Sequence, residues 1–305
     1  MSRANSTNLW RWSALAFYAI SVAFIYFLLD YLVSARKLLF ANSPTSLIMP
    51  ILVYLSAHLV RAVRLGVLIG DISVRQLLIL HLYCAACSAF IPFKLGELAR
   101  VNEVSRWMHS YWKGIVVVWI ERLFDVLVLA GLTVFVATTG SSAALEQLRS
   151  LLWLIGGFVT VSVLFFLILP EQLCALNLHV IKKYQRKKAI NFLRAIDSLY
   201  ELLHQARPML AGRWVTLTVL TLLVWGFELQ ALALVFAYDD WGRAAGTLAY
   251  QLSGLISLGH DQGQLPQTLL AFDNLKLALI GVLGLVAMAF YLKLRRTRTG
   301  GIPYE

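Results

Sequence analysis

Three charged residues lie inside a strongly hydrophobic stretch of this chain. Glu121, Arg122 and Asp125 follow the apolar run 115–120 and precede the apolar run 126–130. In a membrane-spanning helix, which rises about 1.5 Å per residue, Glu121 lies roughly 10 Å past the start of that stretch. A charge at that depth in lipid is costly unless it is paired or hydrated. The stretch therefore predicts a polar site within the membrane rather than a passive anchor.

The spacing of these charges leaves two interpretations open. Arg122 and Asp125 are three residues apart and can pair on one helical face, whereas Glu121 projects about 100° away. Glu121 therefore needs another partner, and the candidates are Arg61, Arg64 and Arg100. A buried ion network that fixes helix packing is one interpretation. The other is a site for an anionic head group, because arginine forks match phosphate oxygens.

A second polar segment precedes this stretch at residues 92–100, with the sequence Pro-Phe-Lys-Leu-Gly-Glu-Leu-Ala-Arg. Pro92 ends the apolar run before it, because its ring blocks helix continuation. Gly96 permits a close backbone approach. Glu97 and Arg100 are three residues apart and could pair on one helical face. The plain alternative is a capped helix end that carries an ordinary surface ion pair.

Together the two segments resemble the transmembrane domain of the lysylphosphatidylglycerol synthase/flippase family. The usual pattern of that family is Pro-x-x-x-Gly-Glu-x-x-Arg, followed by Glu-Arg-x-x-Asp. The matching positions here are Pro92, Gly96, Glu97, Arg100, Glu121, Arg122 and Asp125. Arg61 and Arg64 resemble the basic pair that closes the preceding helix of the family. The resemblance implies movement of lipids or lipid-linked head groups across a bilayer, and it does not name the lipid.

The second half of the chain departs from the family pattern. Family members often carry a glycine-rich segment with a proline and a glutamate there, whereas residues 257–266 contain no glutamate. Glu228 lies at the middle of another apolar stretch. It could carry a coupling proton or pair with the network of charges around Arg122, or it could be protonated and make one helix–helix hydrogen bond.

Composition places these residues in a membrane protein. The chain has 305 residues, of which 59% are hydrophobic and 14% are charged, whereas a soluble domain carries about 25% charged residues. The net charge of +11 comes from residues that flank hydrophobic stretches, which is typical of membrane orientation and not of nucleic-acid binding. We expect an all-α, polytopic integral membrane protein with no cleavable signal peptide. The cysteines Cys84, Cys87 and Cys174 indicate no disulfide framework.

The apolar stretches predict about six spanning helices, because a span needs about 20 apolar residues. Two shorter stretches, 76–93 and 244–259, predict re-entrant or broken helices, which lipid tolerates only where protein or water surrounds them. The predicted spans are 12–33, 45–62, 114–138, 148–169, 211–238 and 275–293.

The hydropathy pattern also predicts a single transmembrane domain over 1–305 that contains an inverted repeat. A first unit at 45–138 and a second at 211–293 each have the order span, re-entrant segment, span. A basic connector at 171–210 joins them. The positive-inside rule places this connector and both termini in the cytoplasm, together with the basic residues Lys94, Arg100, Arg106 and Lys113. We expect the membrane to be the cytoplasmic (inner) one.

The sequence shows no nucleotide-binding loop, no Rossmann fingerprint and no nucleophile elbow, and we expect no cofactor. His81, Cys84 and Cys87 have a superficial metal-ligand spacing. Residues three apart drift around a helix, and no fourth ligand is evident, so we expect a packing histidine, buried cysteines and no metal site.

We therefore expect translocation of an anionic lipid or of a polyprenyl-phosphate-linked cell-envelope intermediate across the cytoplasmic membrane. The hypothesis assigns the phosphate-attracting lining to Arg61, Arg64, Arg100 and Arg122. Glu97, Glu121 and Asp125 would hold these arginines in place. The re-entrant segments, with Pro92 and Gly96 in the first, would act as gates, and Glu228 would support them.

Two other functions fit the same residues. The chain could be an integral membrane transferase for a glycosyl or aminoacyl group on a lipid-linked substrate, with Asp125, Glu121 or Glu228 as general base. It could also be a non-catalytic membrane partner of envelope-biosynthesis enzymes. The expected partners are the membrane and a lipid, and the sequence leaves the energy source and the oligomeric state open.

Overall fold

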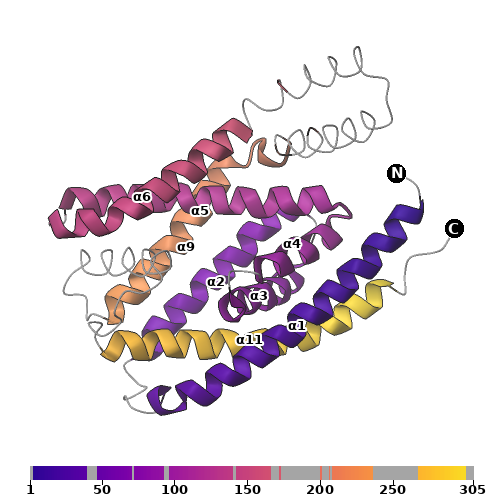
Figure 1. Ribbon diagram of the computed structural model, residues 1–305, viewed down its shortest axis with the longest axis horizontal. Coiled ribbons are helices and arrows are strands. Elements are labelled where there is room, and N and C mark those ends of the chain that lie inside the picture. The colour runs from indigo at the N-terminus through magenta and orange to yellow at the C-terminus, as the bar shows by residue number, and fades with distance from the viewer. Residues whose placement is uncertain are drawn as a thin grey trace.

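Helices make up nearly all of the part of the chain that a computed structural model describes (Figure 1). That part comprises residues 3–39, 47–70, 72–92, 96–139, 142–165, 208–235 and 267–299, with the single residues 172, 200 and 206. The all-α prediction is confirmed. In chain order the helices are α1 (Arg3–Leu39), α2 (Ile48–Ile69), α3 (Val74–Phe90), α4 (Gly96–Trp107), α5 (Tyr111–Thr139), α6 (Ser142–Val163), α9 (Trp214–Val235) and α11 (Gln267–Thr299).

Four of the described helices are long and apolar enough to cross a membrane. The candidate spans are Trp12–Leu32, Ile48–Ile69, Trp214–Val235 and Leu269–Leu294, and they fall on four of the predicted spans. The helix predicted to end at residue 62 continues to Ile69. The prediction stops short because Arg61 and Arg64 interrupt the apolar run, whereas both side chains are paired inside the protein.

The predicted span 114–138 lies within α5, and the predicted span 148–169 begins in α6 and runs past its end at Val163. Because α5 begins at Tyr111, Glu121 lies roughly 15 Å along this helix, rather than the roughly 10 Å expected from the apolar run.

Helices α3 and α4 form a hairpin in the middle of the other helices (Figure 1). The Ser88 hydroxyl of α3 donates a hydrogen bond to Glu97 of α4 at 3.4 Å. A Cβ atom at Gly96 would collide with the backbone of Cys87 and Ser88, so only glycine allows this approach. The sequence predicts that Pro92 ends the apolar run, and α3 ends at Phe90, after which the chain returns through α4.

The end of α3 packs against α1 and α11. The ring of Phe90 lies 5.8 Å from that of Phe24 and 5.5 Å from that of Tyr31, and Gly281 of α11 faces the same phenylalanine. A short helix of this kind cannot cross a bilayer alone, because its 17 residues span only about 25 Å. Its neighbours α1 and α11 therefore supply the protein surroundings of its last turn at Phe90.

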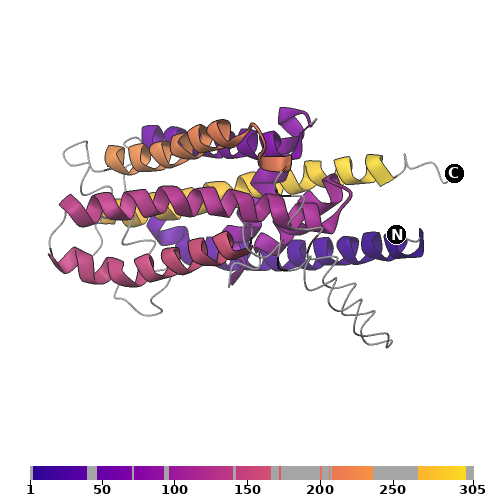
Figure 2. The ribbon, with the colours of Figure 1, turned by 90° about the horizontal axis from the view of Figure 1, so that it is seen from above.

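Figure 2 shows the long helices in layers, and Figure 1 shows α2 and α9 crossing α5 obliquely. Helices α1 and α11 run antiparallel, since Phe17 lies beside Tyr291 and the Tyr31 hydroxyl donates to Asn274. Helices α2 and α9 pack closely along their lengths, and Arg213, just before α9, donates to the carbonyl oxygen of Val67 near the end of α2.

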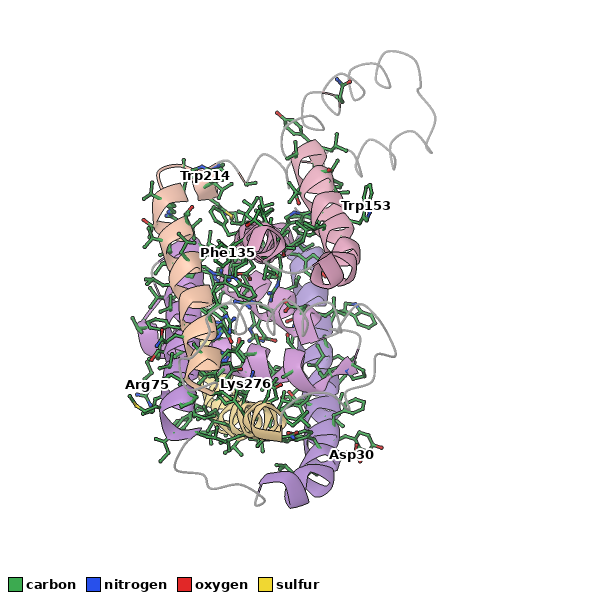
Figure 3. All side chains as sticks on the ribbon, turned by 90° about the vertical axis from the view of Figure 1, so that its left-hand side faces the viewer. Asp30, Arg75, Phe135, Trp153, Trp214 and Lys276 are labelled. Atoms are coloured by element: carbon green, nitrogen blue, oxygen red, sulfur yellow. The ribbon has the colours of Figure 1, made fainter. Side chains whose placement is uncertain are left out.

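The outer surface is apolar, as expected for a protein in lipid. Figure 3 shows Trp153 projecting outward from α6, where it is 74% exposed. The second re-entrant segment 244–259, the segment 257–266 and nearly all of the connector 171–210 lie outside the described residues. The inverted repeat therefore stays a prediction.

Candidate functional site

The deepest part of the candidate site is an ion pair between α2 and α5. The Arg64 guanidinium meets the Asp125 carboxylate with both of its ends, Nη1–Oδ1 at 2.5 Å and Nη2–Oδ2 at 3.2 Å. Nη1 also donates to the Thr221 hydroxyl of α9 at 3.1 Å. Arg64 is only 2% exposed. Three helices therefore share one buried guanidinium.

Glu121 receives the partners that the sequence suggests. Arg100 of α4 donates through Nη2 to Glu121 Oε1 at 2.9 Å, and Arg64 Nε lies 3.6 Å from the same oxygen. Burial opposes the charge of a guanidinium, but the carboxylate of Glu121 offsets this cost for Arg100 by direct contact. Both Arg100 and Glu121 are buried, so this pair is closed to solvent.

Arg122 joins the hairpin to α5. Its Nη2 donates to Glu97 Oε1 at 2.5 Å, and its Nη1 donates to Asp125 Oδ2 at 3.3 Å. The Arg122–Asp125 pair expected from their spacing is therefore present. The expected Glu97–Arg100 pair is replaced by two interhelical pairs, because each charge finds a better-placed partner on α5. The Arg122 side chain is 40% exposed.

Glu228 is also paired, and its partner is Arg61. Arg61 Nη2 lies 3.0 Å from Glu228 Oε1, and the two side chains are 21% and 13% exposed. Of the alternatives that the sequence leaves open, the structure shows an ion pair, and Arg122 itself is held by Glu97 and Asp125. The Arg61–Glu228 ion pair joins α2 to α9, so the second half of the chain also contributes to the site.

The network formed by these ion pairs is balanced in charge. Its cations are Arg61, Arg64, Arg100 and Arg122, and its carboxylates belong to Glu97, Glu121, Asp125 and Glu228. Four positive and four negative charges give a formal sum of zero. We call these eight residues the charge network. Its two buried arginines are enclosed by acids, while Arg122 and, to a lesser degree, Arg61 remain accessible.

All eight residues of the charge network lie within the part of the chain that matches one protein family. The sequence pattern of the family described as the lysylphosphatidylglycerol synthase TM region matches residues 13–258. The chain belongs to this family. Comparison with curated proteins and with solved structures gave no match. The match establishes a multi-pass membrane protein of a lipid-related family, as the resemblance implied.

In this family member, His58 and His81 form a separate buried pair. Nδ1 of His58 and Nε2 of His81 are 3.0 Å apart, and the ring of Tyr54 lies edge-on to His58. Cys84 and Cys87 are buried free thiols. Among the described residues, no group of three or more histidine, cysteine, aspartate or glutamate side chains is placed to hold a metal ion.

Sequence reasoning missed a second polar cluster around Glu103 of α4. The Tyr291 hydroxyl donates to Glu103 Oε2 at 2.5 Å, the Trp107 indole donates to Tyr291, and Asn102 donates to Glu103 Oε1 at 2.7 Å. These donors come from both α4 and α11. The fully buried carboxylate gave no signal in the sequence, because a glutamate in a polar helix resembles a surface residue.

Proposed function

We propose that this protein translocates an anionic lipid, or a polyprenyl-phosphate-linked intermediate, between the leaflets of the cytoplasmic membrane. The observation that carries the proposal is the guanidinium of Arg122, which is 40% exposed and held between two carboxylates on an apolar helix. Its accessible edge can donate hydrogen bonds to phosphate oxygens, and a low dielectric strengthens such an interaction. Membership in a lipid-related membrane family supports the same function.

In this proposal the four arginines have two roles. Arg122 and Arg61 contact the lipid phosphate, because parts of both side chains are accessible. Arg64 and Arg100 hold the helices together from within. Glu97 and Asp125 keep Arg122 in place while its accessible edge binds the phosphate.

The hairpin of α3 and α4 supplies the gate in this proposal. Pro92 bends the chain at its tip, and Gly96 sets the close contact of the two arms. Because Glu97 follows the tip directly and holds Arg122, a shift of the hairpin changes the access of lipid to the guanidinium. Glu228, through Arg61, links α9 to the same site.

Retention of lipid tests the proposal most directly. Native mass spectrometry of gently extracted protein identifies the lipids that copurify with the wild type, with Arg122→Ala and with Arg75→Ala. Arg75 is an exposed arginine at the start of α3, outside the charge network, so its variant is the matched control. Loss of a charge-assisted hydrogen bond of about 1.5–3 kcal/mol lowers retention of an anionic or polyprenyl-phosphate lipid roughly ten- to a hundredfold in Arg122→Ala alone.

The retained lipid is then reconstituted in vesicles with purified protein, and its movement between leaflets is measured. Translocation by the wild type and its loss in Arg122→Ala support the proposal. Equal lipid profiles in a correctly folded Arg122→Ala protein, together with unchanged translocation, overturn it. Turnover of a soluble donor on the lipid would favour a transferase instead.

A further inference from the structure

A second site lies on the opposite side of α4 from the charge network. A groove of about 430 Å³ runs between α1 and α4. Its wall is formed by Trp12, Ala16, Ala19, Ile20 and Leu98. Trp12 is 70% exposed and Leu98 is 55% exposed, so the groove opens on the outer, lipid-facing surface. The small side chains of Ala16 and Ala19 leave the space between the two helices.

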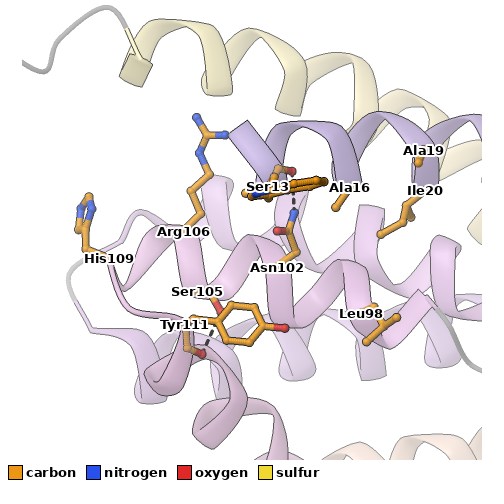
Figure 4. A pocket seen from close by; sticks show the side chains of 11 residues that line it. Ser13, Ala16, Ala19, Ile20, Leu98, Asn102, Ser105, Arg106, His109 and Tyr111 are labelled. Atoms are coloured by element: carbon orange, nitrogen blue, oxygen red, sulfur yellow. Dashed lines mark hydrogen bonds between the residues drawn. The ribbon is translucent and has the colours of Figure 1, made fainter. Parts of the chain in front are cut away.

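One end of this groove is basic. Figure 4 shows Arg106 and His109 at one end, and Ala19, Ile20 and Leu98 toward the other. Asn102 donates to the carbonyl oxygen of Ser13 at 3.1 Å and bridges the two helices between these ends. The groove is therefore amphipathic along its length, with charge at the end where α1 begins and α4 ends.

The backbone holds His109 in an unusual conformation at that end. Its φ angle is +50°, the only positive φ of a non-glycine residue in the described chain. Hydrogen bonds from Met108 to Val104 and from Ser110 to Ser105 close the end of α4 around it. Glycine is the usual residue at such a helix end, so the imidazole at the rim of the groove costs conformational energy that glycine would not.

Helix α4 separates the groove from the charge network. The α4 residues that line the groove share one face of the helix, because successive members are four, three and one residues apart: Leu98, Asn102, Ser105 and Arg106. Because an α-helix turns 100° per residue, the Arg100 side chain projects from the face of α4 opposite the groove. The Glu97 side chain also projects away from the groove, to one side of it. Their partners Glu121 and Arg122 belong to α5. The groove is thus distinct from the site of the proposed function.

We infer that this groove binds one anionic phospholipid of the surrounding bilayer, which stays bound and is not the translocated molecule. An acyl chain fills the apolar part along Ala16 and Ala19, because an apolar groove open to lipid excludes water. The phosphate lies against Arg106 and His109.

Competition between two phospholipids tests this inference. Purified protein is incubated with equal amounts of phosphatidylglycerol and phosphatidylcholine, and native mass spectrometry gives the ratio of the two bound lipids. Arg106→Gln lowers the preference for phosphatidylglycerol about fivefold, since each basic residue near a head group contributes about that factor. Arg106→Gln combined with His109→Gln lowers it further. Ala16→Trp fills the groove and reduces the binding of both lipids.

Two controls make the result decisive. Arg75→Gln removes an exposed arginine beside a different cavity, between α3 and α11, and leaves the ratio unchanged. Excess inorganic phosphate also leaves it unchanged, because a free anion lacks the acyl chain that fills the groove. If Arg106→Gln and the double variant give the wild-type ratio while remaining monodisperse, the inference is overturned. Competition by inorganic phosphate would also overturn it, in favour of a simple anion site.

Discussion

At the scale of single residues, the charge network joins helices rather than neighbouring turns. Arg64 and Asp125 connect α2 with α5, and Arg61 and Glu228 connect α2 with α9. The sequence was sufficient to predict which residues take part, because charges in apolar stretches need partners. The spacing of three residues on α4 suggested Arg100 as the partner of Glu97, whereas the partner is Arg122 of α5. Spacing along one helix cannot show which charges a neighbouring helix brings closer.

The buried pair of Arg64 and Asp125 has a clear energetic signature. Asp125→Ala leaves a guanidinium at 2% exposure with only part of its partners, and we expect the free energy of unfolding to fall by about 3–5 kcal/mol. Replacing both residues by leucine removes the unpaired charge and recovers most of this loss. Thermal unfolding in detergent measures both. A double variant that is no more stable than Asp125→Ala would contradict this account.

At the scale of helices, hydropathy predicted the long elements and missed the return arm of the hairpin. Helices α1, α2, α9 and α11 are apolar over more than 18 residues, so hydropathy finds each of them, although Arg61 and Arg64 hid the second half of α2. Helix α4 carries Glu97, Arg100, Asn102 and Glu103, and such a composition predicts a surface segment. Its place inside the bundle follows from partners on α5 and α11, which a single sequence does not place.

The hairpin depends on one glycine. Gly96→Ala places a methyl group against the backbone of Cys87 and Ser88, and we expect a loss of about 1–3 kcal/mol in unfolding free energy through overpacking. Gly131→Ala is the matched control, since a methyl group at Gly131 would meet no atom within 4 Å and alanine favours a helix by up to about 1 kcal/mol. Thermal unfolding compares the two. Equal stability of both variants would refute the close contact at the tip.

At the scale of the whole molecule, one end of the bundle gathers the basic side chains. The start of α1, the end of α11 and the turn between α4 and α5 lie at this end (Figure 1). Described basic residues here include Arg75, Arg106, Lys113, Arg213 and Lys293. The positive-inside rule predicts that this end faces the cytoplasm. The sequence predicts the same orientation, but the inverted repeat rests on hydropathy, because its second re-entrant segment lies outside the described residues.

Cysteine labelling tests this orientation. Single cysteines are introduced at Asn8 and at Thr297 in a chain whose three cysteines are replaced by alanine. We expect a membrane-impermeant maleimide to label both positions in inverted vesicles and neither in intact cells, since α1 and α11 are antiparallel and begin and end on the same side. Labelling of the two positions from opposite sides would contradict the fold, and labelling of both from outside would reverse the orientation.

The glycine contacts of the hairpin also decide which joints of the molecule can move. Gly96 brings α4 against α3, and a side chain at Gly114 of α5 would meet Ser105 of α4, so these three helices are tightly packed on one another. Arg64 of α2 meets both Glu121 and Asp125 of α5, and His58 of α2 meets His81 of α3. Any separation of α2 from these three helices would therefore have to break all of these buried polar contacts together.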